Sequence, residues 1–334
     1  MRFILIGLFF VNFSIPYQIL QSSAPNMIYS RATYFSCSKL EESIILATSE
    51  GSVKDYLKSL YLEARNRRGS AKVAAENAKK LLVSNDIRSA KEAMIAINIF
   101  KLSGDLEEAV NVLNHMINIS VVDAILFNNV IDGFARRRQW EMAIELLENM
   151  IALSIIPDTI SYSSAICACE KAGRWQEALQ LLEKMILNNI DRDTICYSSV
   201  ISACASRGRW KESLMILKQM KVEGISYDTI TLNSAILAAA KDGQVDIVLK
   251  LLSAMSKDGY HKDMITYTSA ISACLDSDNW QCALRLVDEL TTGVDTAELP
   301  FTTAPFNAAI SVCLKYCLIH PTIYVRRLMI SIFS

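Results

Sequence analysis

DTISYSSAICACEKAGRWQEALQLLEKM, residues 158–185, is the stretch that decides the fold, because its pattern of residue types returns every 35 residues. All four tryptophans of the chain lie at multiples of this spacing from one another, and Val245 occupies the position where one is missing. An aromatic-rich position and an isoleucine keep the same register. The members are Trp140, Trp175, Trp210 and Trp280; Phe127, Tyr162, Tyr197, Leu232 and Tyr267; and Ile131, Ile166, Ile201, Ile236 and Ile271. Such a period indicates one supersecondary unit copied along the chain.

Each copy has the pattern of a helical hairpin. In residues 159–193 the apolar side chains follow 3- and 4-residue spacing up to Gly173, and a second periodic set begins at Trp175. Gly173 is expected to stop the first helix, because helices often end on a left-handed residue, and Gly208 and Gly243 recur at this position. Small residues mark where the two helices should cross: Ala143, Ala178, Ser213 and Ala283. Each hairpin must bury one face on each neighbour, which predicts an all-α fold of stacked hairpins.

The register also predicts the domain organisation. The regular repeats are residues 124–158, 159–193, 194–228 and 229–263, followed by a repeat with an insertion, 264–302, and a partial repeat with an irregular tail, 303–334. Upstream, residues 41–123 form an N-terminal helical region with degenerate repeats at 55–89 and 90–123. The first of these keeps the register weakly, at Leu62, Ala74 and Leu81. Because each repeat contacts only its neighbours, chain length counts repeats rather than globular domains.

Bulk composition excludes several classes of protein. Charge is nearly balanced, with 34 Lys plus Arg against 35 Asp plus Glu, and 51% of residues are hydrophobic, which argues against disorder and against a generally polyanion-coating surface. Four cysteines share one repeat position that Phe134 and Ala239 fill elsewhere, so they are expected to be buried packing residues: Cys169, Cys204, Cys274 and Cys313. No C-x-x-C motif occurs and the histidines lie far apart, so no catalytic residue, metal site or cofactor is predicted.

Residues 1–40 are predicted to be a targeting segment. They contain no acidic side chain, and an apolar run from Phe3 to Phe13 follows a basic start, which suits a signal-peptide core but is too short for a stable membrane anchor. Residues 21–39 are rich in hydroxylated and basic side chains, as organelle transit peptides are. This two-part address resembles that of plastids reached through the secretory route. The alternatives are a mitochondrial presequence and a start codon assigned too far upstream. No stable membrane insertion of the mature protein is expected.

The segments DTISYSSAI (158–166), AGRWQEAL (172–179) and LLEKM (181–185) together resemble the pentatricopeptide repeat, in a P-type-like array over roughly residues 90–317. The tetratricopeptide repeat is the runner-up, but it has a period of 34 residues and carries its tryptophan in the first helix. The resemblance implies a right-handed α-solenoid, a superhelix of stacked helix-turn-helix repeats. It also implies binding of single-stranded RNA, with one base read by each repeat.

The resemblance assigns roles to three kinds of residue. Bases are read by the fifth and last residues of a repeat: Asn128 with Asp158, Ser163 with Asp193, Ser198 with Asp228, Asn233 with Asp263, and Thr268 with an unassigned partner. By the family's pairing rules, Asn with Asp resembles a uracil reader and Ser with Asp a guanine reader, which gives a core of 5′-UGGU-3′. Apolar side chains that sandwich the bases are Ile125, Ile160, Ile195, Ile230 and Ile265, and phosphate contacts are Arg136, Lys171 and Lys241.

Each of these roles has a structural alternative. The aspartates precede predicted helices and could serve as N-caps alone, since Asp is favoured there. The isoleucines could be core residues and the basic residues a solvated face. The tryptophans open the second helix of each hairpin, so we expect them to pack between helices rather than contact RNA.

The resemblance therefore predicts a sequence-selective RNA-binding protein of an organelle that acts in transcript stability, processing, editing or translation. It would be a monomer, with protein partners in an RNA-processing complex as a further expectation. No deaminase or nuclease motif follows residue 317, so the chain is predicted not to be an enzyme. Two alternatives stay open: a helical scaffold that binds proteins, and a fragment of a repeat enzyme that lacks its C-terminal catalytic domain.

Overall fold

The computed structural model describes residues 53–66, 70–275, 277, 279–293, 303–315 and 325. The predicted targeting segment, most of the predicted insertion and the C-terminal tail lie outside these residues. All regular elements in the described part are α-helices, which confirms the all-α prediction. None of the helices in these ranges is both long and apolar enough to cross a membrane.

The helices alternate between the first and second arms of successive hairpins. The first helices are α2 (Val53–Asn66), α4 (Ala90–Ser103), α6 (Ala124–Arg136), α8 (Thr159–Ala172), α10 (Thr194–Ser206), α12 (Thr229–Lys241), α14 (Met264–Ala273) and α16 (Ala304–Lys315). The second helices are α3 (Ser70–Val83), α5 (Leu106–Asn118), α7 (Trp140–Ala152), α9 (Trp175–Leu187), α11 (Trp210–Val222), α13 (Val245–Lys257) and α15 (Trp280–Gly293). From α6 to α15 both series begin at intervals of 35 residues, as the sequence register predicts.

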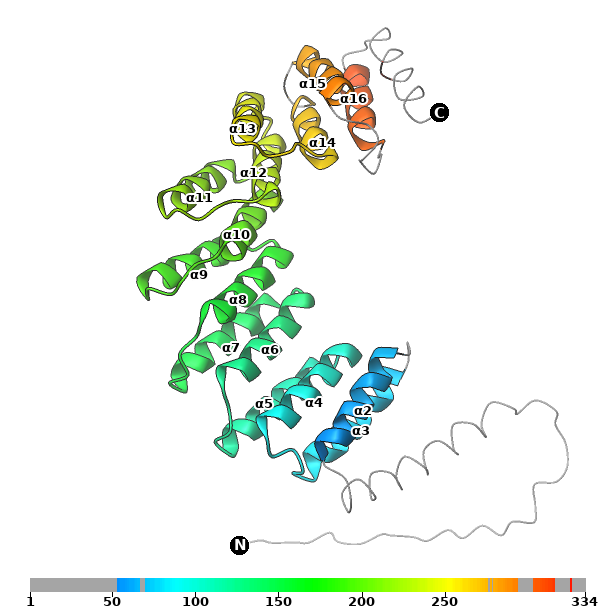
Figure 1. The fold of residues 1–334 in the computed structure, drawn as a ribbon, viewed down its shortest axis with the longest axis vertical. Helices are drawn as coiled ribbons and strands as arrows, with labels where there is room; N and C mark the ends of the chain where they lie inside the picture. The colour runs from blue at the N-terminus through cyan, green and yellow to red at the C-terminus, as the bar shows by residue number, and fades with distance from the viewer. Residues whose placement is uncertain are drawn as a thin grey trace, which may run out of the picture. The chain divides into compact units, whose positions relative to one another are not determined.

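The hairpins stack into two layers within the compact unit that begins at Leu57. From α4 on, each first helix packs against the next first helix, while each second helix packs against its own first helix and the first helix of the following hairpin (Figure 1). The first helices therefore form one continuous layer. The second helices form the other layer, and from α5 on each of them packs against two first helices. This arrangement confirms a solenoid of helical hairpins.

The repeated apolar residues form the core between these layers. The isoleucines of the 35-residue register are fully buried in the middle of each first helix: Ile131, Ile166, Ile201, Ile236 and Ile271. The small residues at the predicted crossings, Ala143, Ala178, Ser213 and Ala283, are also fully buried. Complete burial of one such isoleucine contributes roughly 1.5–3 kcal/mol, so the same stabilising contact is made once in every repeat.

The predicted glycine stops are confirmed. Gly173, Gly208 and Gly243 have φ values of +69°, +66° and +66°, the left-handed conformation that lets the chain leave the first helix. The backbone N–H of Gly173 also donates to carbonyl groups in the last turn of α8. Each hairpin can therefore turn sharply into its second helix.

One sequence assignment near the N-terminus is wrong. Leu62 was expected to keep the core register, but its side chain is 53% exposed, and Leu57, Leu60 and Ala64 are the buried residues of α2. The helix begins at Val53, two residues before the start of the degenerate repeat at 55, and two residues turn a helix by about 200°. The face that Leu62 occupies is therefore turned away from the core.

The tryptophans join neighbouring repeats. The guanidinium of Arg174 lies 4.4 Å from the ring centroid of Trp140, and that of Arg209 lies 4.5 Å from the centroid of Trp175. Each of these arginines is the N-cap of the next second helix, so the cation–π contact crosses one repeat boundary. The indole N–H of Trp210 instead donates to Asp242, at 2.7 Å. These contacts agree with a packing role for the tryptophans.

The four cysteines of the shared position are fully buried, as predicted. Burial raises the pKa of the Cys169 and Cys204 thiols to about 12. These thiols therefore stay protonated at neutral pH and serve as small packing groups.

Candidate nucleic-acid interface

The second residue of each first helix from α6 to α14 is an isoleucine that projects from the surface. The exposed fractions are 57% for Ile125, 59% for Ile160, 62% for Ile195, 69% for Ile230 and 64% for Ile265. Six residues later in each helix, the register isoleucine is fully buried, so the exposed series is not part of the core. A row of large apolar side chains left in water on consecutive repeats is a surface suited to stacking with planar groups.

The last residue of each regular repeat caps the next first helix. Asp158, Asp193, Asp228 and Asp263 each accept the backbone N–H of the third helical residue, at 2.8 Å in all four cases. Asp123 does the same for α6, at 2.9 Å. The aspartates are therefore N-caps. A carboxylate has more lone pairs than this one bond uses, so capping leaves acceptor capacity for a second partner.

In the two asparagine repeats the predicted base-reading pair is already in contact. The side-chain amide of Asn128 donates to Asp158 Oδ1 at 3.1 Å, and that of Asn233 donates to both carboxylate oxygens of Asp263 at 3.1 Å. The two members of a pair are 30 residues apart in sequence and come from adjacent first helices. Stacking of the hairpins therefore assembles these pairs, which lie at equivalent places three repeats apart.

The serine repeats have a different geometry. The hydroxyl groups of Ser163 and Ser198 each donate to the backbone carbonyl three residues earlier, at 3.1 Å. Within the described residues, no direct hydrogen bond joins either serine to the last aspartate of its repeat. A serine side chain is shorter than an asparagine side chain, so it does not span the same gap. Thr268 likewise donates to the Met264 carbonyl, at 2.6 Å, and the last residue of its repeat lies outside the described residues.

Two hydroxyl groups at the third position of the following repeat also belong to this network. Ser161 Oγ donates to Asn128 Oδ1 and Thr266 Oγ1 donates to Asn233 Oδ1, both at 2.6 Å and buried. Sequence reasoning did not single out these residues. The available signal was the capping-box pattern, in which an N-cap Asp is followed three residues later by a polar side chain that returns a hydrogen bond to it.

Hydrogen bonding also stabilises the ionised form of Asp158. Burial raises the pKa of its carboxyl group, but donors from Ser161 and Asn128 outweigh burial, so the pKa lies below its ordinary value. The carboxylate is ionised at neutral pH and acts only as an acceptor. This charge state is the one that both helix capping and recognition of N–H groups require.

The predicted phosphate contacts have partners within the protein. Arg136 forms an ion pair with Asp132 at 3.0 Å, and Lys241 donates to the Ser206 carbonyl at the end of the preceding first helix, also at 3.0 Å. Lys171 is exposed at the equivalent position of α8. The side chain of Arg136 is 70% exposed, so its ion pair leaves it accessible to solvent and to a phosphate group.

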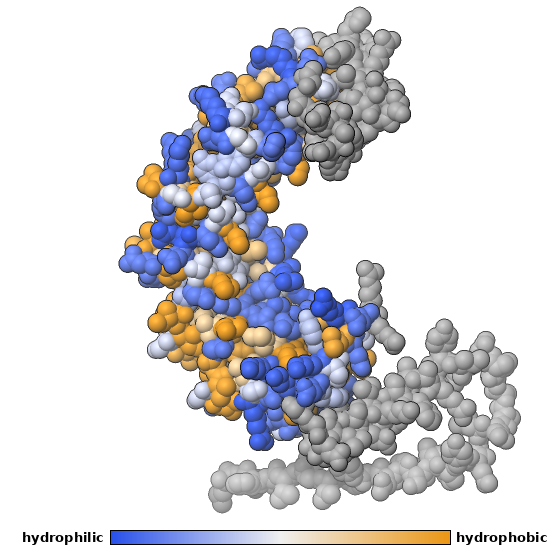
Figure 2. Space-filling model, viewed as in Figure 1, coloured by the Kyte–Doolittle hydropathy of each residue, from blue (hydrophilic) through white to orange (hydrophobic). Residues whose placement is uncertain are grey.

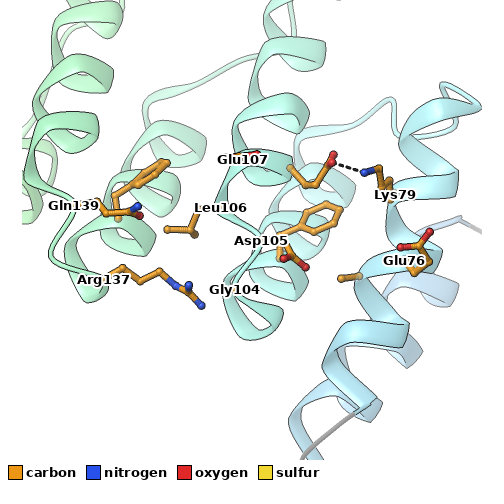
Figure 3. A pocket seen from close by; sticks show the side chains of 12 residues that line it. Glu76, Lys79, Gly104, Asp105, Leu106, Glu107, Arg137 and Gln139 are labelled. Carbon is orange, nitrogen blue, oxygen red and sulfur yellow. Dashed lines mark ion pairs between the residues drawn. The ribbon is translucent and has the colours of Figure 1, made fainter.

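A pocket of about 500 Å³ between α3, α5 and α6 contains none of the predicted site residues (Figure 3). On one side of it, Lys79 forms an ion pair with Glu108 at 2.6 Å. On the other side, Arg137 points towards Gly104, where an added Cβ would come within 1.9 Å of the guanidinium. The Lys79–Glu108 ion pair joins α3 to α5, so this side of the pocket contributes to packing between neighbouring hairpins.

A second group of exposed apolar residues lies on the layer of second helices. Hydrophobic residues gather on the side of the molecule where α7, α9 and α11 lie (Figure 2). They include Ile151, Leu187 and Val222, which are exposed at the C-terminal ends of these helices. This surface belongs to the other layer from the one that carries the exposed isoleucine series.

Sequence comparison identifies one repeat family along the regular part of the chain. Residues 122–171 and 157–206 match the PPR repeat family, residues 195–225 and 265–292 match the PPR repeat, and residues 215–277 match the pentatricopeptide repeat domain. Together these matches cover residues 122–292, just over half of the chain. No curated protein sequence matches the chain significantly.

Solved structures show the same fold. The chain is similar to the pentatricopeptide repeat protein PPR10 in complex with an 18-nt psaJ RNA element, with 18% identity and a TM-score of 0.60 over 90% of this chain and 40% of that one. It is also similar to PPR10 from maize, with 16% identity and a TM-score of 0.55 over 86% of this chain and 45% of that one. The chain thus spans less than half the length of these structures.

Proposed function

Because the chain belongs to the pentatricopeptide repeat family, we propose that it binds single-stranded RNA along its layer of first helices, one base to each repeat. The observation that carries the proposal is the exposed isoleucine series on consecutive first helices, with polar pairs beside it in two of the repeats. Apolar side chains that stay in water at a 35-residue period offer stacking surfaces, and the adjacent polar groups offer hydrogen bonds to base edges.

The two pair geometries support two kinds of base recognition. In the asparagine repeats, the amide keeps one N–H and a carbonyl lone pair for a base, a combination that matches the O4 and N3–H groups of uracil. In the serine repeats, the carboxylates of Asp193 and Asp228 are not engaged by the fifth residue, so they can accept N–H groups from a guanine. The regular repeats then read 5′-UGGU-3′, with Asn128 at the first base and Asn233 at the fourth.

The proposed role is in organellar RNA metabolism. The protein acts by occupying a transcript, and this occupancy affects the stability, processing, editing or translation of the transcript. The composition of residues 1–40 supports a plastid address, with the mitochondrion as the alternative. The near-neutral charge supports local rather than general contact with phosphates. The protein acts as a monomer.

The proposal is tested by binding of the full chain to short RNAs that contain UGGU or UUUU, at one fixed salt concentration. Preference for UGGU is the expected result. Equal affinity for the two RNAs would refute base reading by the repeats. Absence of binding to either RNA would refute the proposed function and favour a scaffold that binds proteins.

Exchange of one base-reading residue gives a sharper test. Ser163→Asn places an asparagine opposite Asp193 and should shift the preference at the second base from G towards U by about 1–3 kcal/mol, the usual scale for a directly read position. Ser253→Asn, an exposed serine on the second helix α13, is the matched control and should leave base preference unchanged. A uniform loss of affinity for all RNAs in Ser163→Asn would instead assign Ser163 to packing.

A further inference from the structure

The hydroxyl groups of Ser161 and Thr266 occupy the same place beside two separate asparagine repeats, at the third position of the repeat that follows each. In each, the hydroxyl oxygen accepts the backbone N–H of the capping aspartate at 3.1 Å and lies 2.6 Å from the asparagine carbonyl oxygen. The asparagine is almost completely buried between this hydroxyl and the aspartate. The repetition of one arrangement in two repeats, with Ser in one and Thr in the other, indicates that the hydroxyl group is the shared requirement.

These contacts favour one orientation of the asparagine amide. The aspartate is an acceptor, so it requires the NH₂ end of the amide. The hydroxyl accepts the backbone N–H of the aspartate, and its own hydrogen lies within bonding distance of two acceptors: the carbonyl end of the amide at 2.6 Å and the aspartate Oδ1 at 2.8 Å. The carbonyl end is the nearer of the two. Turning the amide over would place its oxygen against a carboxylate and break the hydrogen bond between the hydroxyl and the carbonyl end, and buried polar groups are costly to leave unpaired.

A fixed amide orientation has a consequence for pyrimidine recognition. Uracil presents an acceptor at O4 and a donor at N3, whereas cytosine presents a donor at N4 and an acceptor at N3. An amide that binds one of them in a given position must be turned over to bind the other in the same position. The partners of the amide can therefore decide which pyrimidine is accepted.

We propose that Ser161 and Thr266 are positioning residues that make Asn128 and Asn233 select uracil against cytosine. The inference rests on the proposed RNA binding and deepens it. It does not extend to the serine repeats, because the third positions of the repeats that follow them are Cys196 and Thr231. The hydroxyl of Thr231 donates to Asp228 at 2.7 Å and so supports the N-cap of α12. The fifth residue of the preceding repeat is Ser198, so this hydroxyl has no asparagine amide to orient.

The test compares binding of the full chain to RNAs that contain UGGU or CGGU at fixed salt. The unaltered protein should prefer UGGU. Ser161→Ala should reduce this U-to-C ratio by about fivefold, the effect of losing one neutral hydrogen bond, while Ser161→Thr should keep it. Thr231→Ala is the matched control: it removes a hydroxyl from the same helical position of another repeat and should leave the ratio at the first base unchanged.

An unchanged ratio in Ser161→Ala, in a protein that prefers UGGU, would overturn the positioning role but leave the proposed function intact. An unaltered protein that binds RNA without distinguishing U from C at the first base would also overturn it. Failure of the unaltered protein to bind RNA would refute the proposed function itself. Thr266→Val and Thr266→Ser, assayed with UGGU and UGGC, repeat the test at the fourth base and keep it decisive where Ser161→Ala does not fold.

Discussion

Replacing Ile160 by alanine should weaken RNA binding with little effect on the fold, while replacing Ile166 in the same helix should destabilise the fold. The two residues belong to the same repeat and undergo the same chemical change. They differ in environment, because Ile160 is 59% exposed and Ile166 is fully buried. The pair therefore separates a surface role from a core role within α8.

The expected magnitudes follow from these environments. Alanine lacks three carbon groups of isoleucine, each worth about 0.8 kcal/mol when it is fully buried. Because Ile160 is more than half exposed, folding gains less than half of this burial free energy there. Ile160→Ala should therefore cost about 1 kcal/mol of folding stability, partly offset by roughly 0.4 kcal/mol from the better helix propensity of alanine. If RNA covers the exposed part, binding should weaken by about 1.4 kcal/mol, or about tenfold. Ile166→Ala should cost about 2–5 kcal/mol of folding stability.

Two measurements on the same samples are needed. Urea unfolding followed by circular dichroism gives the stability of each variant, and fluorescence anisotropy with a labelled UGGU RNA gives its affinity. Ile195→Ala and Ile230→Ala should reproduce the result of Ile160→Ala, since their side chains are at least as exposed. Unchanged affinity in all three variants would refute the assignment of the isoleucine series to RNA contact, whatever their stability.

Three further predictions concern stability. Asp193→Ala should cost about 1 kcal/mol because α10 loses its N-cap, and Asp193→Ser should recover most of it; equal thermal destabilisation in both variants would contradict capping. Burial raises the pKa of Glu223, but donors including Tyr197 and Arg192 lower it below its ordinary value, so its stabilisation is present above about pH 4.3 and is lost as pH falls through the lowered pKa. Glu223→Gln should therefore flatten the acid-side decline in urea-unfolding stability, and an equally steep decline would rule this out. Gly224→Ala should cost roughly 1–2 kcal/mol, because φ is +71° there with no neighbouring atom in the way, and a neutral result in urea unfolding would contradict backbone strain as the cause.

Local signals explain why much of the fold could be predicted. Asp before a helix and Gly after it act within a few residues, so the bounds of α8, α10 and α12 followed from the repeat register. The prediction failed where these signals are weak, at Leu62 in α2, because no aspartate stands directly before that helix as it does before α8, α10 and α12.

The candidate site was only partly predictable, because its members come from different repeats. The sequence named Asn128 and Asp158 as a pair, but it did not distinguish their direct contact from the separation of Ser163 and Asp193. Side-chain length decides that difference only once the spacing between stacked helices is known. The same holds for Ser161, whose hydroxyl reaches an amide 33 residues away.

By itself, the sequence determined the 35-residue hairpin and its helix ends, because both depend on short-range propensity or on the period of apolar residues. It could not decide whether Ile160 or Ile166 lies in the core, since both are isoleucines of one helix. The tertiary structure decided this, because stacking buries one face of each first helix and leaves the other in water. Stacking also places each asparagine between an aspartate and a hydroxyl of the next repeat, a contact that exists only when two hairpins are packed together.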